Sequence, residues 1–162
     1  MDQNIWEYDD FIFKGDELKG MTAKGKDKVK AGGQTDLVIP AVTPDGLPLK
    51  KIADNAFYRR GLTSVVIPDT VESIGYDAFG VCKLKEVKLP EALVNIEGFA
   101  FYRNKLTKVE FGSKVKRIEP SAFAMNELSE ITLPETLEYI GASAFYKNAF
   151  ETITFPKALT KI

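Results

Sequence analysis

The chain has 162 residues, enough for one domain with a real core, and its 44% hydrophobic and 28% charged residues are ordinary for a soluble globular protein. Its formal net charge of −1 gives no reason to expect nucleic acid or an anionic membrane as a partner, and no apolar run approaches the roughly 18 residues of a membrane-spanning helix. The chain has no histidine and one cysteine, which removes histidine-based catalysis, histidine-ligated metals and an internal disulfide framework. We expect no catalytic residue, no metal and no cofactor.

Residues 1–36 differ in pattern from the rest of the chain. Aromatic residues alternate from Trp6 to Phe13, which predicts a hairpin with its turn near Gly15-Asp16. The basic, glycine-rich run 24–33 predicts a solvated loop; a contact with a polyanion is the alternative, and Asp27 interrupts the run. Residues 1–6 lack the pattern of a secretory signal, which leaves a cytoplasmic protein or one whose signal has been removed.

From residue 37 onward, the chain is built on a repeat of 22 residues. Four complete units span 62–149, a modified first unit spans 37–61 with extra residues at 41–48, and residues 150–162 begin a further unit. Apolar residues recur in register, among them Ile74, Ile96, Ile118, Ile140 and Ile162, and also Phe79, Phe101, Phe123 and Phe145. Such a period predicts a solenoid whose coils stack on a shared core, and residues 1–36 then form the cap that a solenoid needs.

Within each unit, we expect a strand such as 63–67, then a short extended segment, then a tight helical turn that buries an Ala-Phe pair. The turns begin with polar residues expected to act as N-caps: Asn55, Asp77, Ser121 and Ser143. Phe99 takes this position in one unit and is expected to distort or expose its turn. We call the residues that share one position of the repeat a column. A later column consists of Cys82, Asn104, Asn126 and Asn148, which we expect to be buried and to satisfy backbone groups of the next coil. Cys82 is then structural rather than reactive.

The unit Leu-x-x-Val-x-Ile-Pro-x-x-Val-x-x-Ile-Gly-x-x-Ala-Phe-x-x-Cys resembles the BspA-like leucine-rich repeats, also called the Treponema pallidum type. Residues 37–162 carry the resemblance. It implies an α/β-type solenoid, mostly β: a right-handed leucine-rich repeat with short parallel strands, capped by the N-terminal hairpin. It also implies a binding scaffold, because members of the family are typically bacterial surface or secreted proteins associated with adhesion.

Two surfaces are candidates for binding. Outward-facing strand residues form rows of alternating charge: Glu86, Lys108 and Glu130 in one row, and Lys88 and Glu110 in the next. This face is either a self-compensated solvated surface or a polar binding surface. The second candidate is a strip in which an aromatic residue and a cation recur in every second coil, about 10 Å apart: Tyr58, Arg59, Tyr102, Arg103, Tyr146 and Lys147. The tyrosines either pack over Gly80 and Ala124 or offer a stacking strip to a protein or glycan.

We therefore expect a non-enzymatic protein-binding or adhesion module at the cell surface or secreted, with an intracellular interaction scaffold as the alternative and a hydrolase as a distant third. Its carboxylates, such as Glu97 and Glu119, look scattered and without a convergent pocket. The expected partner is a protein or a glycan, with neither nucleic acid nor direct membrane insertion. Phe150, Ile153, Phe155 and Leu159 are expected to be partly uncovered, which predicts weak self-association through the C-terminal end.

Overall fold

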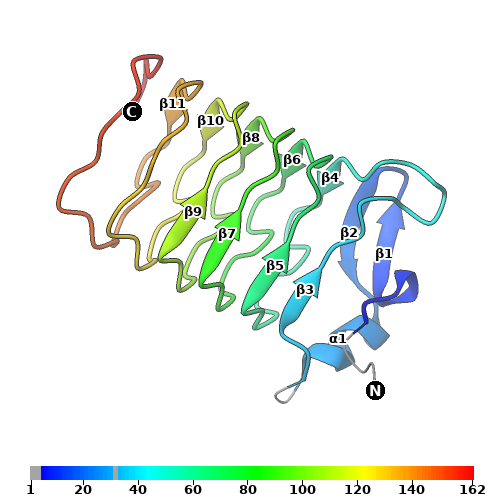
Figure 1. Cartoon of the computed structure of the whole chain (residues 1–162). Coiled ribbons are helices and arrows are strands. Elements are labelled where there is room, and N and C mark those ends of the chain that lie inside the picture. The colour runs from blue at the N-terminus through cyan, green and yellow to red at the C-terminus, as the bar shows by residue number, and fades with distance from the viewer. Residues whose placement is uncertain (1–4, 31–32) are drawn as a thin grey trace.

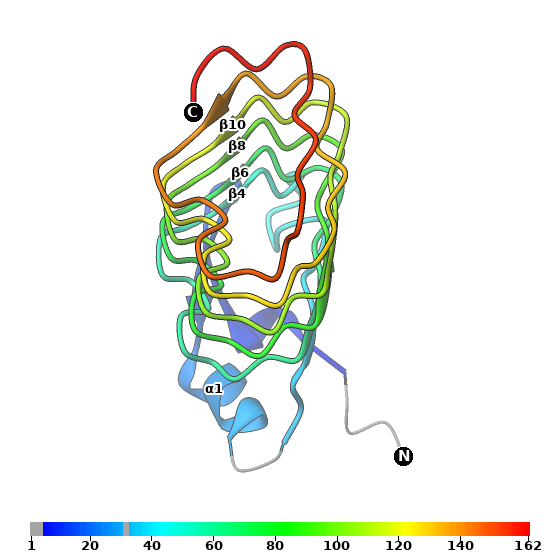
Figure 2. The same cartoon turned by 90° about the vertical axis from the view of Figure 1, so that its left-hand side faces the viewer.

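The computed structural model describes residues 5–30 and 33–162 and shows a stack of similar coils with the N-terminal segment packed at one end (Figure 1). Viewed along the stack, the coils superimpose as a flattened ring around a common interior (Figure 2). Residues 1–4 and 31–32, which belong to the expected cap and basic loop, lie outside the described residues. The expected solenoid of short strands with little helix is confirmed.

The N-terminal cap is an antiparallel hairpin preceded by one short helix. Its elements are the 3-10 helix η1 (Tyr8–Asp10) and the strands β1 (Phe11–Lys14) and β2 (Glu17–Met21). Lys14 pairs with Glu17, so the turn falls where it was predicted, and Gly15 has the left-handed φ of 59° that a two-residue hairpin turn requires. β2 then pairs in parallel with β4 (Lys51–Ile52), so the hairpin covers the first coil and continues the sheet of the repeats.

The coils contribute strands to two separate ladders. The first ladder contains β3 (Asp36–Val38), β5 (Ser64–Val66), β7 (Glu86–Lys88) and β9 (Lys108–Glu110). The second ladder follows the isoleucine column and contains β4 together with β6 (Ser73–Ile74), β8 (Asn95–Ile96), β10 (Arg117–Ile118) and β11 (Tyr139–Ile140). All strand pairings between these coils are parallel, as predicted.

The second ladder is more continuous than the sequence indicated. It forms a seven-stranded sheet in the order β1-β2-β4-β6-β8-β10-β11, whereas the first ladder is divided into the pairs β3–β5 and β7–β9. A Cβ at Gly75 or Gly141 would collide with the backbone of the preceding coil, so glycine permits a close approach at these two positions. We call the surface that carries β3, β5, β7 and β9 the strand face.

Phenylalanine rings form the centre of the core, as the repeat predicted. Consecutive rings of the column lie parallel, with centroids 5.3–5.7 Å apart, along Phe57, Phe79, Phe101, Phe123 and Phe145. The first four side chains are fully buried, whereas Phe145 is half-buried. The stacked, buried column holds neighbouring coils together through area burial and ring contact.

An asparagine ladder runs beside the phenylalanines. Asn104 Nδ2 donates to the carbonyls of Phe79 and Phe101, and its Oδ1 accepts from the backbone N–H of Leu84. Asn126 and Asn148 repeat this geometry one and two coils later. The prediction that these side chains satisfy backbone groups is confirmed, although the partners lie in the preceding coil and in the same coil, not in the next one, and Asn148 is only half-buried.

The turns are not built as predicted. The residues expected to be helix N-caps have left-handed φ angles of 55–59°: Asn55, Asp77, Ser121 and Ser143. An N-cap has extended backbone, so that assignment was wrong; Asn55 and Asp77 suit the left-handed region, whereas Ser121 and Ser143 have no such preference. Phe99 adopts the same φ of 59°, so its turn is not distorted; its half-buried ring packs against Tyr76 and Tyr102.

The basic segment after the hairpin was predicted as a solvated loop, and this was wrong. Residues Ala23–Val29 form the helix α1, whose N-cap Thr22 accepts a hydrogen bond from Gly25 N at 3.2 Å. Gly25 is buried against the carbonyl of Asp10, where any Cβ would collide. Capping and this packing outweigh the low helix propensity of glycine.

Candidate functional site

The strand face has two different halves. Near the cap, an exposed apolar pair stands beside a polar one: Val38 pairs with Val66, with exposures of 52% and 59%, and Asp36 pairs with Ser64. Further along, Glu86 pairs with Lys108, and Lys88 pairs with Glu110, as the period predicted. In the column of Val38, Val66, Lys88 and Glu110, the exposed residue therefore changes from valine to a charged residue along the stack.

The charged half is only partly self-compensated. The ion pair of Lys108 is with Glu110 on its own strand, at 2.6 Å. The hydrogen bond between them raises the pKa of Lys108 and lowers the pKa of Glu110, with smaller effects from Glu86 on the lysine and Lys88 on the carboxylate. The two side chains are exposed, so the pair contributes little to stability.

Glu130 does not lie where the period placed it. It was expected on a strand beside Lys108, but residues 129–133 form no strand, and β9 pairs only with β7 in its sheet. A groove of about 640 Å³ opens there between Lys108 and Glu130, with Phe111 and Ile131 among its lining residues. The prediction of a third strand in this charged row was therefore wrong.

An apolar groove lies at the cap end of the strand face. It has a volume of about 570 Å³, and its lining residues come from the N-terminal segment and from the chain around β3: Ile5, Trp6, Glu7, Tyr8, Phe11, Val38 and Pro40. Ile5 and Tyr8 are 59% and 49% exposed. We call this feature the apolar groove, and Val66 on β5 extends its apolar surface along the strand face.

The wall of the apolar groove is held in place by Trp6. Its indole Nε1 donates to the carbonyl of Asp36 at 2.7 Å, and its ring packs 5.6 Å from the ring of Phe11. Trp and Tyr are the residues that most often dominate protein interfaces, and sequence reasoning found none on the strand face. They come from the cap, and the 22-residue period carries no information about where the cap packs.

The predicted tyrosine strip is present but only partly open. Tyr58 and Tyr102 are half-buried, whereas Tyr146 is 57% exposed. Arg59 lies 5.2 Å from the ring of Tyr58, and Lys147 lies 5.6 Å from the ring of Tyr146. Two of the three cations of the strip therefore lie over its own rings. Its role in binding stays a prediction.

Two carboxylates that looked scattered are neighbours on the seven-stranded sheet. Glu97 lies close enough to Glu119 and Asp54 that burial, followed by these two negative charges, raises its pKa, with Arg117 opposing the shift. Glu97 and Asp54 also line an open pocket of about 490 Å³ beside Tyr76. Glu97 and Asp54 thus lie together in one open pocket, whereas glycosidases place two carboxylates across a cleft from each other.

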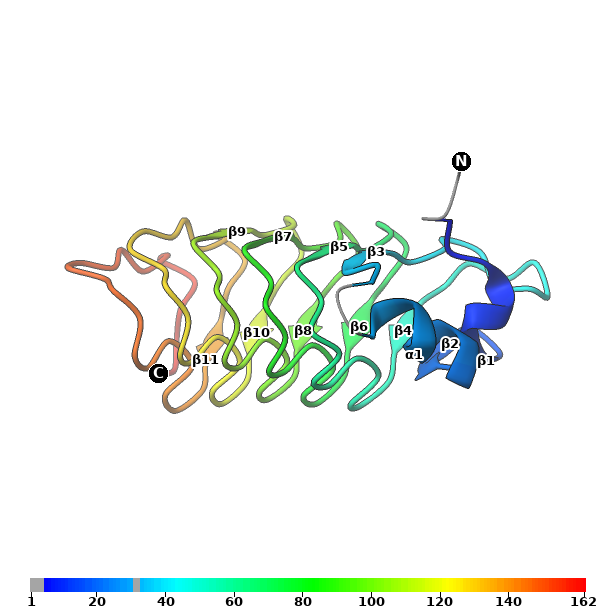
Figure 3. The ribbon, with the colours of Figure 1, turned by 90° about the horizontal axis from the view of Figure 1, so that it is seen from below.

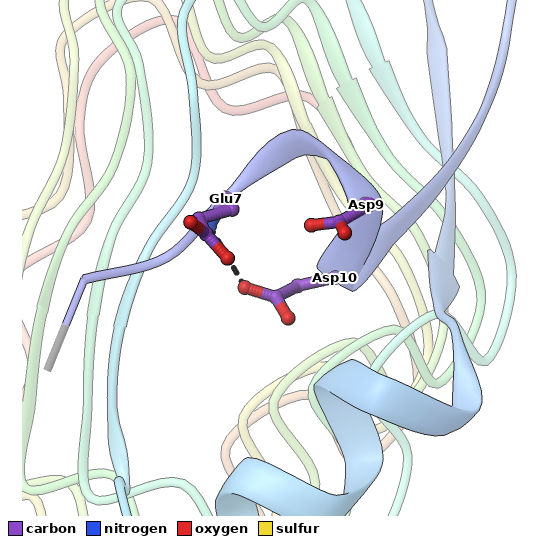
Figure 4. Close-up of side chains that lie close together, drawn as sticks. All are labelled: Glu7, Asp9 and Asp10. Carbon is purple, nitrogen blue, oxygen red and sulfur yellow. Dashed lines mark hydrogen bonds between the residues drawn. The ribbon is translucent and has the colours of Figure 1, made fainter. Parts of the chain in front are cut away.

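A group of three acidic residues in the cap is occupied by lysines. The carboxylates of Glu7, Asp9 and Asp10 lie within 4.8 Å of one another (Figure 4). Lys24 Nζ donates to Glu7 and Asp9, and Lys28 Nζ donates to the fully buried Asp10. These bonds tie α1 to η1. The chemistry of the group is thus that of an ion-pair network in the cap.

Cys82 continues the asparagine column with a thiol. Its Sγ donates to the carbonyl of Phe57 at 3.2 Å, and burial raises its pKa. A buried thiol that titrates high is a poor nucleophile, which agrees with the structural role predicted for it.

Sequence comparison identifies the repeat. The family model of the BspA type leucine-rich repeat region matches residues 50–162 in six copies. The chain belongs to this family. No relative among the curated proteins matches the chain.

Solved structures show the same fold. A leucine-rich repeat protein of T. pallidum is similar over 94% of this chain and 78% of its own, with a TM-score of 0.77 and 24% identity. The pneumococcal vaccine antigen PcpA is similar over 91% of this chain and 47% of its own, with a TM-score of 0.65 and 18% identity. A leucine-rich repeat protein from Bacteroides ovatus is similar over 97% and 54%, with a TM-score of 0.58 and 20% identity. At these identities, the likeness concerns the fold alone. Within the described residues, no helix is long and apolar enough to cross a membrane.

Proposed function

We propose that the chain is a non-enzymatic protein-binding module of a bacterial cell-surface or secreted protein, and that the apolar groove is where its partner docks. BspA type repeats are a binding scaffold, and membership of that family supports this class of function. The observation that carries the proposal is the apolar surface formed by the exposed Tyr8, Val38 and Val66 beside the half-buried Trp6, at one end of a charged face. Apolar anchors inside a polar rim are the usual anatomy of a protein interface.

The partner would place an apolar side chain in the apolar groove and polar groups over the charged half of the strand face. Glu86, Lys88, Lys108 and Glu110 then supply the rim, where charge influences the association rate and specificity more than affinity. Glu130 borders the neighbouring groove and would contact only a partner that reaches across β9.

Binding to immobilised fibronectin, laminin and collagen, measured by interferometry, tests the proposal. Val66→Lys places at β5 the residue that occupies the same position in β7, so the fold tolerates it. It should weaken binding to any protein that the wild type binds by about ten-fold or more, the size expected for loss of an interface anchor. Ile12→Lys is the matched control, because Ile12 is also exposed (48%) and lies on β1 of the seven-stranded sheet, not on the strand face that carries Val38 and Val66. Equal affinities of the two variants would reject the apolar groove.

An intracellular scaffold would use the same apolar groove. Protease treatment of intact cells separates the two settings, because only an exposed protein is degraded. Full protection in intact cells, with degradation after lysis, would favour the intracellular alternative.

A further inference from the structure

The charges of the nearly neutral chain are unevenly distributed around the stack. The whole sequence has 22 basic and 23 acidic residues. By contrast, the segments that lead from the turns into the strand face, 58–63, 80–85, 102–107, 124–129 and 146–151, contain seven basic residues and two acidic ones, Glu127 and Glu151. The basic residues are Arg59, Arg60, Lys83, Lys85, Arg103, Lys105 and Lys147. We call this edge of the stack the basic edge. All seven are exposed except Arg60, which is half-buried.

Helix α1 lies at the same edge of the stack and adds to its charge (Figure 3). Lys26 and Lys30 of this segment line a pocket of about 430 Å³ together with Arg59 and Arg60. The one acidic residue of the lining, Asp27, is paired with Lys30 at 2.7 Å. The Nε of Arg60 is buried without a hydrogen-bond partner among the described residues. A pocket lined by four cations, whose single acidic residue is already paired, suits an anion.

The backbone holds the basic edge rigidly in line. The N–H of Arg59 donates to the carbonyl of Gly80 at 3.0 Å, and the N–H of Arg103 donates to the carbonyl of Ala124 at 3.0 Å. Equivalent bonds join the intervening coils. With coils about 4.8 Å apart, Arg59, Arg103 and Lys147 recur about 10 Å from one another. The backbone positions that carry the cations are thus preorganised as a row, so only side-chain freedom is lost when an extended polyanion binds.

From these observations we infer that the basic edge binds a sulfated polysaccharide that lies along the stack, with one sulfate in the pocket of Arg60. The two-coil spacing is close to the length of a disaccharide unit, and a tyrosine, whose phenol is able to bond sugar hydroxyls, precedes each of Arg59, Arg103 and Lys147 in the sequence. Single-stranded nucleic acid fits less well, because it relies on stacking over free aromatic faces, and Arg59 and Lys147 already lie over two of the rings. The inference depends on the proposed function in one respect: an extracellular location is where the protein would encounter a sulfated polysaccharide.

Heparin oligosaccharides test the inference with the purified whole chain. The triple variant Arg59→Met, Arg103→Met, Lys147→Met places at each site the residue that Met125 already provides at the equivalent position. Its affinity for heparin should fall about ten-fold or more, and the slope of log affinity against log salt should flatten by about one unit per cation removed. The matched control Lys50→Met, Lys114→Met, Lys116→Met removes the same charge from the loops at the opposite edge and should bind like the wild type.

Two further ligands test whether binding requires the sulfate groups of the glycan and whether another polyanion can replace it. Completely desulfated heparin should not bind, and oligothymidylate should compete weakly at equal charge. Equal losses in the two triple variants, or oligothymidylate binding as tightly as heparin, would overturn the inference. The Val66→Lys variant should keep full heparin affinity, so failure of the apolar groove and failure of the basic edge are told apart.

Discussion

The side-chain amide of Asn104 bridges two coils, donating from Nδ2 to the carbonyl of Phe79 across 2.9 Å. The same side chain accepts the N–H of Leu84 at 3.0 Å and is buried. Asn104→Ala leaves these buried backbone groups without a partner, at about 1–3 kcal/mol for each. We expect the free energy of unfolding to fall by about 2–4 kcal/mol, measured by urea denaturation. An unchanged midpoint would show that the ladder is not structural.

The reverse change is expected to stabilise the protein. Cys82 occupies the same column but offers only one hydrogen bond, from its Sγ to the carbonyl of Phe57. Cys82→Asn can make the bonds that Asn104 makes one coil later, so the free energy of unfolding should rise by about 1 kcal/mol. The readout is the thermal midpoint, with Cys82→Ala as the control, which should lower it. A midpoint below that of the wild type in Cys82→Asn would mean that the first coil lacks room for the amide.

The phenylalanine column is expected to carry much of the stability. Phe101 is fully buried and stacks on two neighbours, so Phe101→Ala should cost about 3–5 kcal/mol. The half-buried Phe145 is the matched comparison, and Phe145→Ala should cost clearly less. Denaturation curves with equal losses at both positions would contradict the gradient of burial.

Much of the fold could be predicted from the sequence, because each coil buries the same apolar positions. The period correctly predicted the phenylalanine core, the parallel strands and the asparagine ladder. It did not predict the left-handed turns, because Asn and Asp suit both N-caps and that backbone region, and Ser is typical of N-caps alone. Nor did it predict α1, because a segment with a glycine and several lysines is typical of a loop. The helix depends on the packing of Gly25 against the carbonyl of Asp10, which the sequence does not reveal.

The candidate site was less predictable, because it depends on residues outside the repeat. The apolar groove needs Trp6 and Tyr8 of the cap beside Val38, and no periodicity relates them. Glu130 likewise has no strand around it although its position in the repeat predicted one, because strand formation depends on local backbone pairing that the repeat does not specify. The basic edge was visible in sequence only as separate lysines and arginines, since α1 joins it through tertiary packing.

Glu97 is expected to weaken the fold at neutral pH. Burial, and then the charges of Glu119 and Asp54, raise its pKa above the ordinary value of 4.5. A raised folded-state pKa gives a contribution to stability that is present below the unfolded pKa and is lost as pH rises through the folded one. Glu97→Gln should therefore raise the thermal midpoint at pH 7 and have no effect below about pH 4. The control, Glu72→Gln, removes an exposed partner of Lys50 and should give no gain at pH 7.

Apolar side chains of the last coil are predicted to support weak self-association. Phe155 is 47% exposed, and Phe150, Ile153 and Leu159 are half-buried. Phe155→Lys should lower the association constant measured by sedimentation velocity, because it places a charge in the apolar contact. Tyr102→Ala, on the side of the stack, should leave it unchanged. A wild type that stays monomeric at high concentration would remove this prediction.

The most direct test of the central claim is to map which face touches a bound protein. Benzoylphenylalanine placed at position 66, on the strand face, should crosslink to any matrix protein that the wild type binds. The same probe at position 139, on the opposite seven-stranded sheet, should not. Crosslinking at 139 with none at 66 would contradict the account, as would a wild-type chain that binds no protein while its fold is intact.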